Sequence, residues 1–329
     1  MNTARKGKIL KMSDKAKKNK KKKRSQAPIA LVYFIALCVC LVTVGGTVLM
    51  LFKNNNIMNF GNAESTAYEG YTSNDCKTVL FARVNSKNVL HDLVIYRLDP
   101  TKDKLFIVPL TAYTYDTASG KNLKQALEAG GMPGLTQSVE SCYGISIDRY
   151  MTVSNSAFQN FCDQLGGYTY TAPEDLYYLS GDKDTDANDV ALKAGSTQNL
   201  MGKQIRLIMT YPVFSEGRQG NIKFMASALE TMLKSAFALP DSTKGELDVW
   251  YNILKKKADT NFEEEDYTQM KGIVTDMLDR ATAPVIALTP TGTWSEDEKQ
   301  FIPAQGFRDE LAEQFTPAVV AKNSSSENK

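Results

Sequence analysis

Histidine is almost absent from this sequence: His91 is the single one among 329 residues. A histidine-based metal site takes two or more imidazole ligands, so such a site is not expected. The same scarcity excludes any catalytic triad that requires a histidine other than His91. Histidine chemistry, if present, is confined to this one imidazole.

Cysteine is scarce as well, with five residues and no CxxC pair, and this excludes a disulfide scaffold. Cys38 and Cys40 lie in a long apolar run. The other three, Cys76, Cys142 and Cys162, are an odd number and cannot all pair with one another. One disulfide among them is compatible with the sequence, but three free thiols are the expected state.

The charge of the chain is unevenly distributed. Residues 1–26 contain twelve lysines and arginines and one acid, Asp14, which gives them a net charge of +11. Because the whole chain carries +2, the remaining residues carry about −9. A strongly basic tail is typical of contact with nucleic acid or with an anionic membrane surface. The acidic remainder argues against nucleic acid as a partner of the folded part.

An uncharged run of 24 residues, from Ile29 to Phe52, follows the basic tail. About 20 apolar residues are enough for a helix to cross the hydrocarbon core of a bilayer. We therefore predict a transmembrane helix over residues 27–52. Lysine and arginine concentrate on the cytoplasmic side of such helices. The tail of residues 1–26 is thus expected in the cytoplasm, and the C-terminal domain outside the cell membrane, as a single-pass, extracytoplasmic domain.

A cleaved signal peptide is the alternative to this retained anchor. The apolar region of a signal peptide is usually about 7–15 residues long, and the run here is clearly longer. Small residues suited to cleavage, Gly61 and Ala63, lie too far beyond it. The sequence favours an anchor whose basic tail sets the topology, with contact to anionic lipid headgroups as an additional role.

Beyond the anchor, residues 53–73 are rich in Asn, Gly, Ser and Thr, which is typical of a stalk. The folded domain is expected over residues 74–316, and a disordered tail over 317–329. β-Branched and aromatic stretches predict strands, and apolar residues three or four positions apart predict helices. The predicted strands are 78–84, 92–98, 104–110, 149–153, 168–171 and 205–209, and the predicted helices are 122–129, 135–143, 156–165, 221–236, 263–278 and 307–315, with mostly helical structure from residue 244 onward.

The order of these elements predicts an α/β fold with a mixed central β-sheet flanked by helices. One polar segment, residues 178–197, contains four aspartates between Asp182 and Asp189. A solvated loop is favoured there over a cation site, because the carboxylate spacing does not match a calcium-binding loop.

The stretches GISIDRY at residues 144–150 and DQLGG at residues 163–167 belong to a set of short segments spread over roughly residues 75–315. Taken in order, these segments resemble the LytR-CpsA-Psr family. Residues 144–150 (GISIDRY) are similar to a family GIPIDYY stretch, and residues 163–167 (DQLGG) to a helix that ends in DALGG. It is the order of the segments, more than any one of them, that carries the resemblance. Three further positions complete the set: Gly130-Gly131, Lys121-Asn122 ahead of it, and Thr260-Asn261 before a predicted helix.

The resemblance implies a cell-envelope phosphotransferase that moves an anionic glycopolymer, such as a teichoic acid, from a polyisoprenyl diphosphate carrier to peptidoglycan. Arginine suits this task because its planar fork donates two parallel hydrogen bonds to phosphate oxygens. An acid usually holds Mg²⁺ or acts on the acceptor hydroxyl. The implied partners are bilayer lipid, the carrier-linked glycopolymer and peptidoglycan, with no nucleic acid, and Mg²⁺ is the one cofactor suggested.

The sequence departs from the family at positions that carry charge. Where the family has Pro-Arg-Asp, this chain has Pro109-Leu110-Thr111. The family's Arg-x-Asp becomes Leu90-His91-Asp92, Asn85 stands for an aspartate, and Met209-Thr210-Tyr211 replaces a stretch with two arginines. Of a later motif with two arginines, Arg218 remains.

Two residues carry the expected chemistry: Asp92, as the catalytic acid or a Mg²⁺ ligand, and Arg218, as the catalytic contact to phosphate. Each alone is also compatible with an ordinary surface charge. Further contacts to the substrate are expected at Lys121, Asn122, Arg206 and Gln219.

Three functions remain open at this point. A charge-assisted contact to phosphate contributes roughly 1.5–3 kcal/mol, so the loss of several favours a catalytically weak or inactive carrier-binding or scaffold protein. The alternatives are an active glycopolymer phosphotransferase with shifted contacts, and an unrelated extracytoplasmic domain. A basic, lipid-sized cavity near Asp92 and Arg218 would distinguish them.

Overall fold

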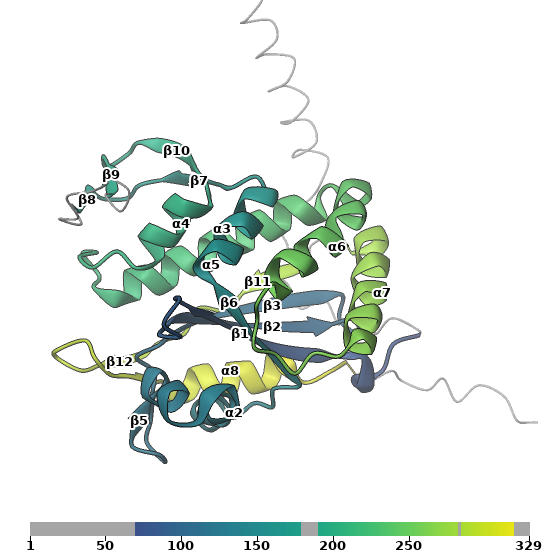
Figure 1. Cartoon of the computed structure of the whole chain (residues 1–329), viewed down its shortest axis with the longest axis horizontal. Coiled ribbons are helices and arrows are strands. Elements are labelled where there is room, and N and C mark those ends of the chain that lie inside the picture. Colours follow the sequence, from purple (N-terminus) through teal and green to yellow (C-terminus); the bar gives the residue numbers. More distant parts are fainter. Residues whose placement is uncertain (1–69, 179–189, 282–283, 319–329) are drawn as a thin grey trace, which may run out of the picture. The chain divides into compact units, whose positions relative to one another are not determined.

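A five-stranded sheet forms the centre of the fold (Figure 1). The computed structural model describes residues 70–178, 190–281 and 284–318. The strand order is β11-β3-β2-β1-β6; β2 runs antiparallel to both of its neighbours, and the two outer pairs are parallel. The predicted mixed sheet is therefore confirmed. Its strands are β1 (Lys77–Val84), β2 (Leu90–Asp99), β3 (Lys104–Thr111), β6 (Arg149–Ser154) and β11 (Val285–Ala287).

Side chains alternate between the two faces of each strand, so the sheet has two apolar surfaces. On β1, Leu80 and Ala82 belong to one buried cluster, whereas Phe81 packs against the other. Arg83 shares the face of Phe81, because the two are two residues apart in a regular strand. The sheet must therefore be covered by helices on both sides.

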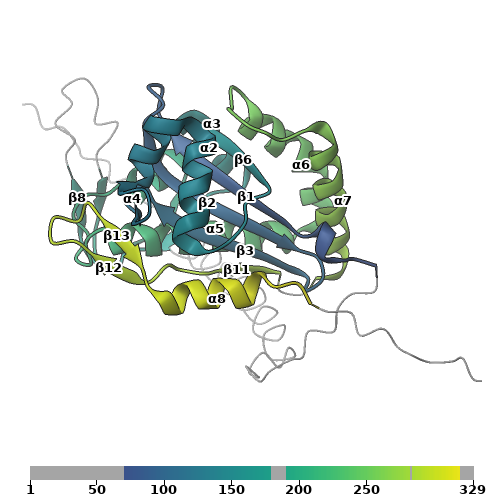
Figure 2. The same cartoon turned by 90° about the horizontal axis from the view of Figure 1, so that it is seen from below.

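Two helices cover the face of Leu80: α2 (Leu123–Tyr143) and α8 (Gln305–Phe315). Seen from below, both lie across the strands (Figure 2). Inside α2, Gly131 has a φ of 61°, which breaks the helical path. Glycine tolerates this left-handed conformation because it has no Cβ. The sequence predicted two helices separated by glycine here, and the structure confirms the break.

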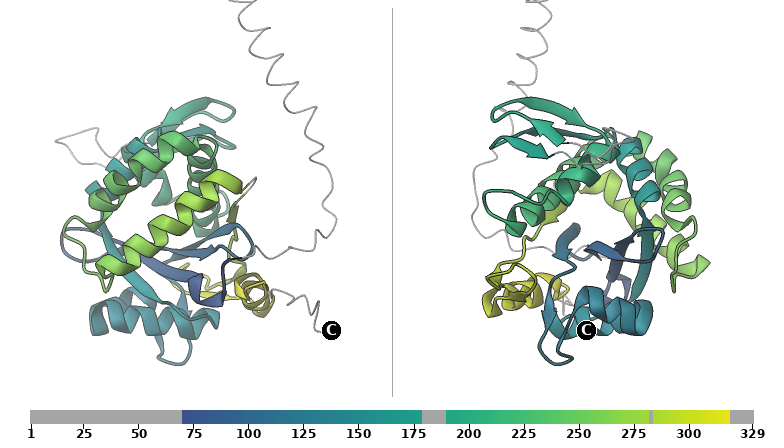
Figure 3. Two further views of the ribbon diagram at one scale, coloured as in Figure 1. Left: turned by 90° about the vertical axis from the view of Figure 1, so that its right-hand side faces the viewer. Right: turned by 60° about the vertical axis from the view of Figure 1, so that its left-hand side comes forward.

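Five helices lie on the opposite face, and Figure 3 shows the strands between the two helix layers. One of them, α6, buries a single residue, Thr243, so it stands off from the sheet and leaves room beneath it. The five are α3 (Asn155–Gln164), α4 (Gly202–Met209), α5 (Arg218–Phe237), α6 (Pro240–Lys255) and α7 (Glu264–Arg280).

Short elements complete the fold at its edges. They are the turn η1 (Ser73–Asp75) and four pairs: β4 (Tyr115–Asp116) with β5 (Lys121–Asn122), β7 (Tyr168–Thr171) with β10 (Thr197–Leu200), β8 (Leu176–Tyr178) with β9 (Val190–Leu192), and β12 (Gly292–Trp294) with β13 (Phe301–Pro303).

The predicted strand at residues 205–209 is wrong, because this stretch lies in helix α4. A short apolar run does not distinguish a strand from a buried helix. Ile205 and Ile208 are both buried, and their spacing is that of a helix. Helix α4 packs closely on α3, because a Cβ at Gly202 would lie 2.1 Å from the carbonyl oxygen of Gln159. The mostly helical C-terminal region also contains three strands that the sequence did not predict, β11 to β13.

The other predicted elements are confirmed to within a few residues, and the cysteines Cys76, Cys142 and Cys162 are buried free thiols. Several predictions fall outside the described residues: the basic tail, the membrane span, most of the stalk, the C-terminal tail from residue 319 and the aspartate-rich stretch 179–189. Among the helices that the structure does describe, none has the length and apolar character needed to cross a membrane.

Candidate functional site

The candidate site lies at one end of the sheet, where β1, β3 and β6 reach their carboxyl ends and β2 begins. Ligands of open α/β sheets commonly bind at the carboxyl ends of the strands. Polar side chains gather there from β1, β2, α2, α3, α4 and α5.

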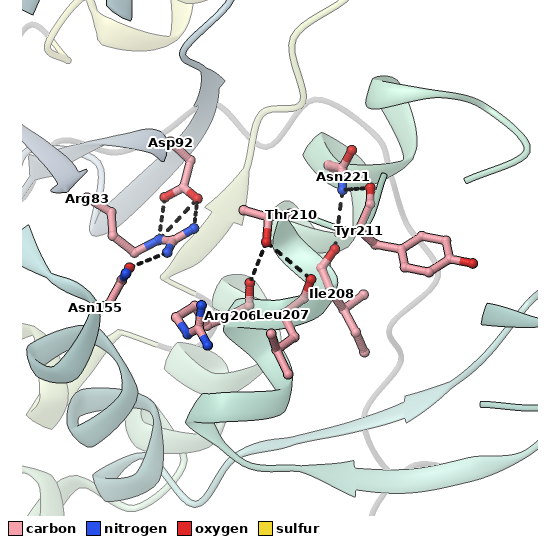
Figure 4. Close-up of polar contacts among 9 residues, drawn as sticks. All are labelled: Arg83, Asp92, Asn155, Arg206, Leu207, Ile208, Thr210, Tyr211 and Asn221. Atoms are coloured by element: carbon pink, nitrogen blue, oxygen red, sulfur yellow. Dashed lines mark hydrogen bonds and ion pairs between the residues drawn. The ribbon is translucent and has the colours of Figure 1, made fainter. Parts of the chain in front are cut away.

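A buried ion pair between Arg83 and Asp92 forms the floor of the site (Figure 4). The two residues are direct cross-strand partners of β1 and β2. The Arg83 Nε donates to both carboxylate oxygens, at 2.9 Å and 3.1 Å, and its Nη2 also donates to Oδ2. Its Nη1 donates to Asn155 Oδ1 at 2.6 Å, and the guanidinium lies 5.5 Å from the centre of the Phe158 ring. The Arg83 side chain is 3% exposed.

Above this pair lies a cavity of about 270 Å³, here called the polar pocket. Asp92 is the one carboxylate among the described residues that line it. Arg218 enters from the first turn of α5, with its guanidinium 4.1 Å from the centre of the Tyr113 ring and its Nε 3.9 Å from Glu298 Oε2. The remaining polar lining comes from His91, Thr111, Lys124, Thr210 and Asn221.

A third arginine, Arg206 of α4, lies beside Arg83 in Figure 4. Burial, and then the positive charge of Arg83, lower the pKa of Arg206. The same positive charges act on His91. Burial lowers the pKa of His91 most, and repulsion from Arg83 lowers it next. Arg206 and Lys124 lower it further, whereas the negative charge of Asp92 raises it. The site is therefore positively charged, and its imidazole is neutral near pH 7.

An apolar cavity of about 210 Å³ adjoins the ion pair on the other side. Arg83 and Asp92 are its charged lining residues, and Asp92 also lines the polar pocket. A second apolar space of about 180 Å³, between α6 and α7, shares four lining residues with it. The shared residues are Phe81, Phe161, Leu254 and Met270.

The structure brings the two main predicted residues together, because Asp92 and Arg218 line the same pocket. Arg206 is not among its lining residues but lies close enough to His91 to lower the pKa of that imidazole. Three other predicted contacts are not among the residues that line the polar pocket. Lys121 is exposed in β5, Asn122 caps α2 by accepting from Gln125 N at 3.0 Å, and Gln219 donates to Pro290 and accepts from Trp294 Nε1. The roles of all six stay predictions.

Sequence reasoning missed Arg83 and Lys124. Arg83 stands in a mostly apolar strand, and no motif marked it as a site residue. Side chains alternate between the two faces of β1, and β1 forms a hairpin with β2. Together these two features could have predicted that Arg83 lies opposite Asp92. Lys124 follows Asn122 by two residues, and the helical rotation of α2 turns it, not Lys121, toward the pocket.

Magnesium does not fit Asp92 well. Mg²⁺ is usually bound through one or two carboxylates and demands near-ideal octahedral geometry. Both oxygens of Asp92 already accept hydrogen bonds from a guanidinium. Within the described ranges, no group of three or more histidine, cysteine, aspartate or glutamate side chains could hold a metal ion.

The lowered pKa of His91 predicts a pH effect on anion binding. Because the pKa of His91 is lowered from its usual value of 6.5, His91 gains a proton, and the polar pocket one positive charge, only as the pH falls below that value. We expect the affinity for inorganic pyrophosphate to rise about threefold to tenfold from this charge alone. Calorimetric titration above and below this pH measures it. The same titration of His91→Gln corrects for protonation of pyrophosphate itself, and identical profiles for the two proteins would contradict the prediction.

Comparison with known proteins bears on the family and the fold. The model of the LytR_cpsA_psr family matches residues 92–276, whereas no curated protein matches the chain. A protein from Eubacterium siraeum described as a transcription regulator has 17% identity and a TM-score of 0.61, covering 79% of this chain and 98% of that one. TagT bound to LIIa-WTA has 16% identity and a TM-score of 0.55, covering 79% and 94%. B. subtilis TagV has 18% identity and a TM-score of 0.55, covering 74% and 98%. At these identities the structures share the fold.

Proposed function

Since the chain belongs to the LytR-CpsA-Psr family, we propose that it binds a polyisoprenyl diphosphate carrier of cell-wall glycopolymer. One observation carries the proposal: Asp92 lines both the polar pocket and the apolar cavity. A polyisoprenyl diphosphate has the same two parts, an apolar chain joined directly to two phosphates. The TagT structure bound to LIIa-WTA supports a ligand of this kind.

Each part of the site suits one part of such a ligand. The apolar cavity and the space beside it are lined by aliphatic and aromatic side chains, which favour isoprene units by about 0.8 kcal/mol per buried methylene. Lys124 and Arg218 line the polar pocket and give it positive charge, to which nearby Arg206 adds. Arginine donors on a diphosphate form charge-assisted hydrogen bonds, which are stronger than neutral ones.

Within this function, we favour a carrier-binding protein with weak or no transfer activity. General-base catalysis needs a group that can accept the proton of the attacking hydroxyl. Both oxygens of Asp92 already accept hydrogen bonds from Arg83, so the carboxylate is not free to face an attacking hydroxyl. Asn85 and Thr111 stand where the resemblance implies further acids.

One observation favours the second candidate, an active glycopolymer phosphotransferase. His91 lines the polar pocket, and its lowered pKa leaves it neutral and able to accept a proton near pH 7. The cations of the pocket would stabilise the departing phosphate.

A transfer assay separates the two candidates. The full chain in detergent is given a polyisoprenyl diphosphate-linked donor and peptidoglycan, and both bound donor and transferred polymer are measured. Binding with no transfer above a boiled-protein control supports the carrier-binding protein. Transfer that is lost in both Arg218→Ala and His91→Gln supports the phosphotransferase. If the donor does not bind at all, the proposed function is wrong.

The proposal also assigns a place to the domain. Residues 27–52 would anchor it in the cell membrane, and the basic tail would lie on the cytoplasmic side of that membrane. The folded domain would then face the outer leaflet and peptidoglycan.

Filling the apolar cavity should separate binding of the lipid chain from binding of the diphosphate. Leu254 of α6 lines both apolar spaces and is half-buried, so Leu254→Trp can fill them without overpacking a closed core. We expect at least about a tenfold loss of affinity for geranylgeranyl diphosphate and no change for inorganic pyrophosphate. Val249→Trp, on the exposed side of the same helix, is the matched control. An equal loss for both ligands would show that the effect is not on the apolar cavity.

A further inference from the structure

We propose that this protein binds diphosphate groups without a divalent metal ion, because Arg83 takes the position that a metal would occupy beside Asp92. The inference rests on the proposed function and specifies how the same site holds its ligand. It starts from the carboxylate of Asp92, whose two oxygens both accept from Arg83.

A metal ion has no access to Asp92 while this pair is intact. A Mg²⁺ bound to either oxygen at about 2.1 Å would lie within a few ångströms of the guanidinium. The two positive charges would repel each other in a site with little water, where electrostatic interactions are stronger than in bulk. The side chains of Arg83 and Asp92 are 3% and 9% exposed, so water cannot screen that repulsion well.

Arg83 is also held firmly in place. Besides Asp92, it donates to Asn155, the first residue of α3, and it lies over the ring of Phe158 in the same helix. Moving it away from Asp92 would leave a buried guanidinium without its counter-charge, which is strongly unfavourable. The pair is therefore a permanent part of the site floor.

The charge of the site then favours direct binding of an anion, with no metal ion between the anion and the protein. With Asp92 neutralised by Arg83, the polar pocket is lined by two cations, Lys124 of α2 and Arg218 of α5, and Arg206 of α4 lies close enough to His91 to lower the pKa of that imidazole. These side chains bring positive charge to a diphosphate without a bridging metal. Guanidinium groups also supply the paired donors that phosphate oxygens accept.

The test compares binding with and without metal. The full chain in detergent micelles is titrated with geranylgeranyl diphosphate, once with MgCl₂ and once with an excess of chelator. We expect dissociation constants that agree to within about twofold. Binding that requires Mg²⁺ would overturn the inference and leave the proposed function standing. Absence of binding in both conditions would overturn both.

Replacing Asp92 with the uncharged Asn should change the affinity for the diphosphate in opposite directions for the two possible roles of Asp92. If Asp92 only balances Arg83, Asp92→Asn releases one positive charge toward the pocket and strengthens binding by about threefold to tenfold. If Asp92 holds a metal that the diphosphate needs, the same change weakens binding. Asp175→Asn, which removes an exposed carboxylate paired with Lys193, is the matched control and should change nothing. Should Asp92→Asn fail to fold, the comparison with and without Mg²⁺ decides alone.

Discussion

Replacing Arg83 with alanine should lower the free energy of unfolding by about 3–5 kcal/mol. The substitution leaves the carboxylate of Asp92 buried without its partner, and Asn155 loses a donor at the start of α3. Breaking a buried pair from one side is costly because the remaining charge has lost both water and counter-charge. Urea titration of the full chain in detergent, followed by tryptophan fluorescence, measures the change.

Two further variants show whether charge is the cause. Arg83→Met combined with Asp92→Leu removes both charges and retains apolar volume, so most of the lost stability should return. Lys193→Ala breaks an ion pair whose side chains are 86% and 55% exposed and should leave the free energy of unfolding nearly unchanged. If the double variant is no more stable than Arg83→Ala, the loss comes from packing, and the ion pair is not the reason for it.

The second large effect is expected at Arg218, whose replacement by alanine should weaken binding of geranylgeranyl diphosphate roughly 10-fold to 100-fold. A hydrogen bond to a charged group contributes about 1.5–3 kcal/mol, which corresponds to this range. The Tyr113 ring orients the Arg218 guanidinium. The distance from Arg218 to the exposed Glu298 carboxylate is too long for a close ion pair, so the guanidinium donors can turn to a ligand. Calorimetric titration of the full chain gives the dissociation constant.

The controls for this prediction use the chemistry of the side chain. Arg218→Lys keeps the charge but not the planar fork, so we expect an intermediate affinity. Arg149→Ala removes an arginine that is paired with Asp266 at the opposite end of the sheet and should leave binding unchanged. A wild-type affinity for Arg218→Ala would remove this residue from the site.

Much of the fold could be predicted because it depends on local patterns. Strands β1 to β3 follow from β-branched and aromatic runs, and helices α3, α5 and α7 from apolar residues three or four positions apart. The pattern failed at α4, where five apolar-rich residues fit either period. It also missed the three-residue strands β11 to β13, which are too short to show any period.

By itself, the sequence determined the segregation of charge, the order of the main elements and the resemblance to the family, and it predicted Asp92 and Arg218 as site residues. Those properties are read from composition, spacing and motif along the chain. Only the tertiary structure showed that Asp92 is paired with Arg83, because the register of two strands brings the two side chains together. The positive pocket and the apolar cavity are likewise assembled from separate helices. Electrostatic and apolar contacts depend on distance in space, and that distance is set by how the strands pair and the helices pack.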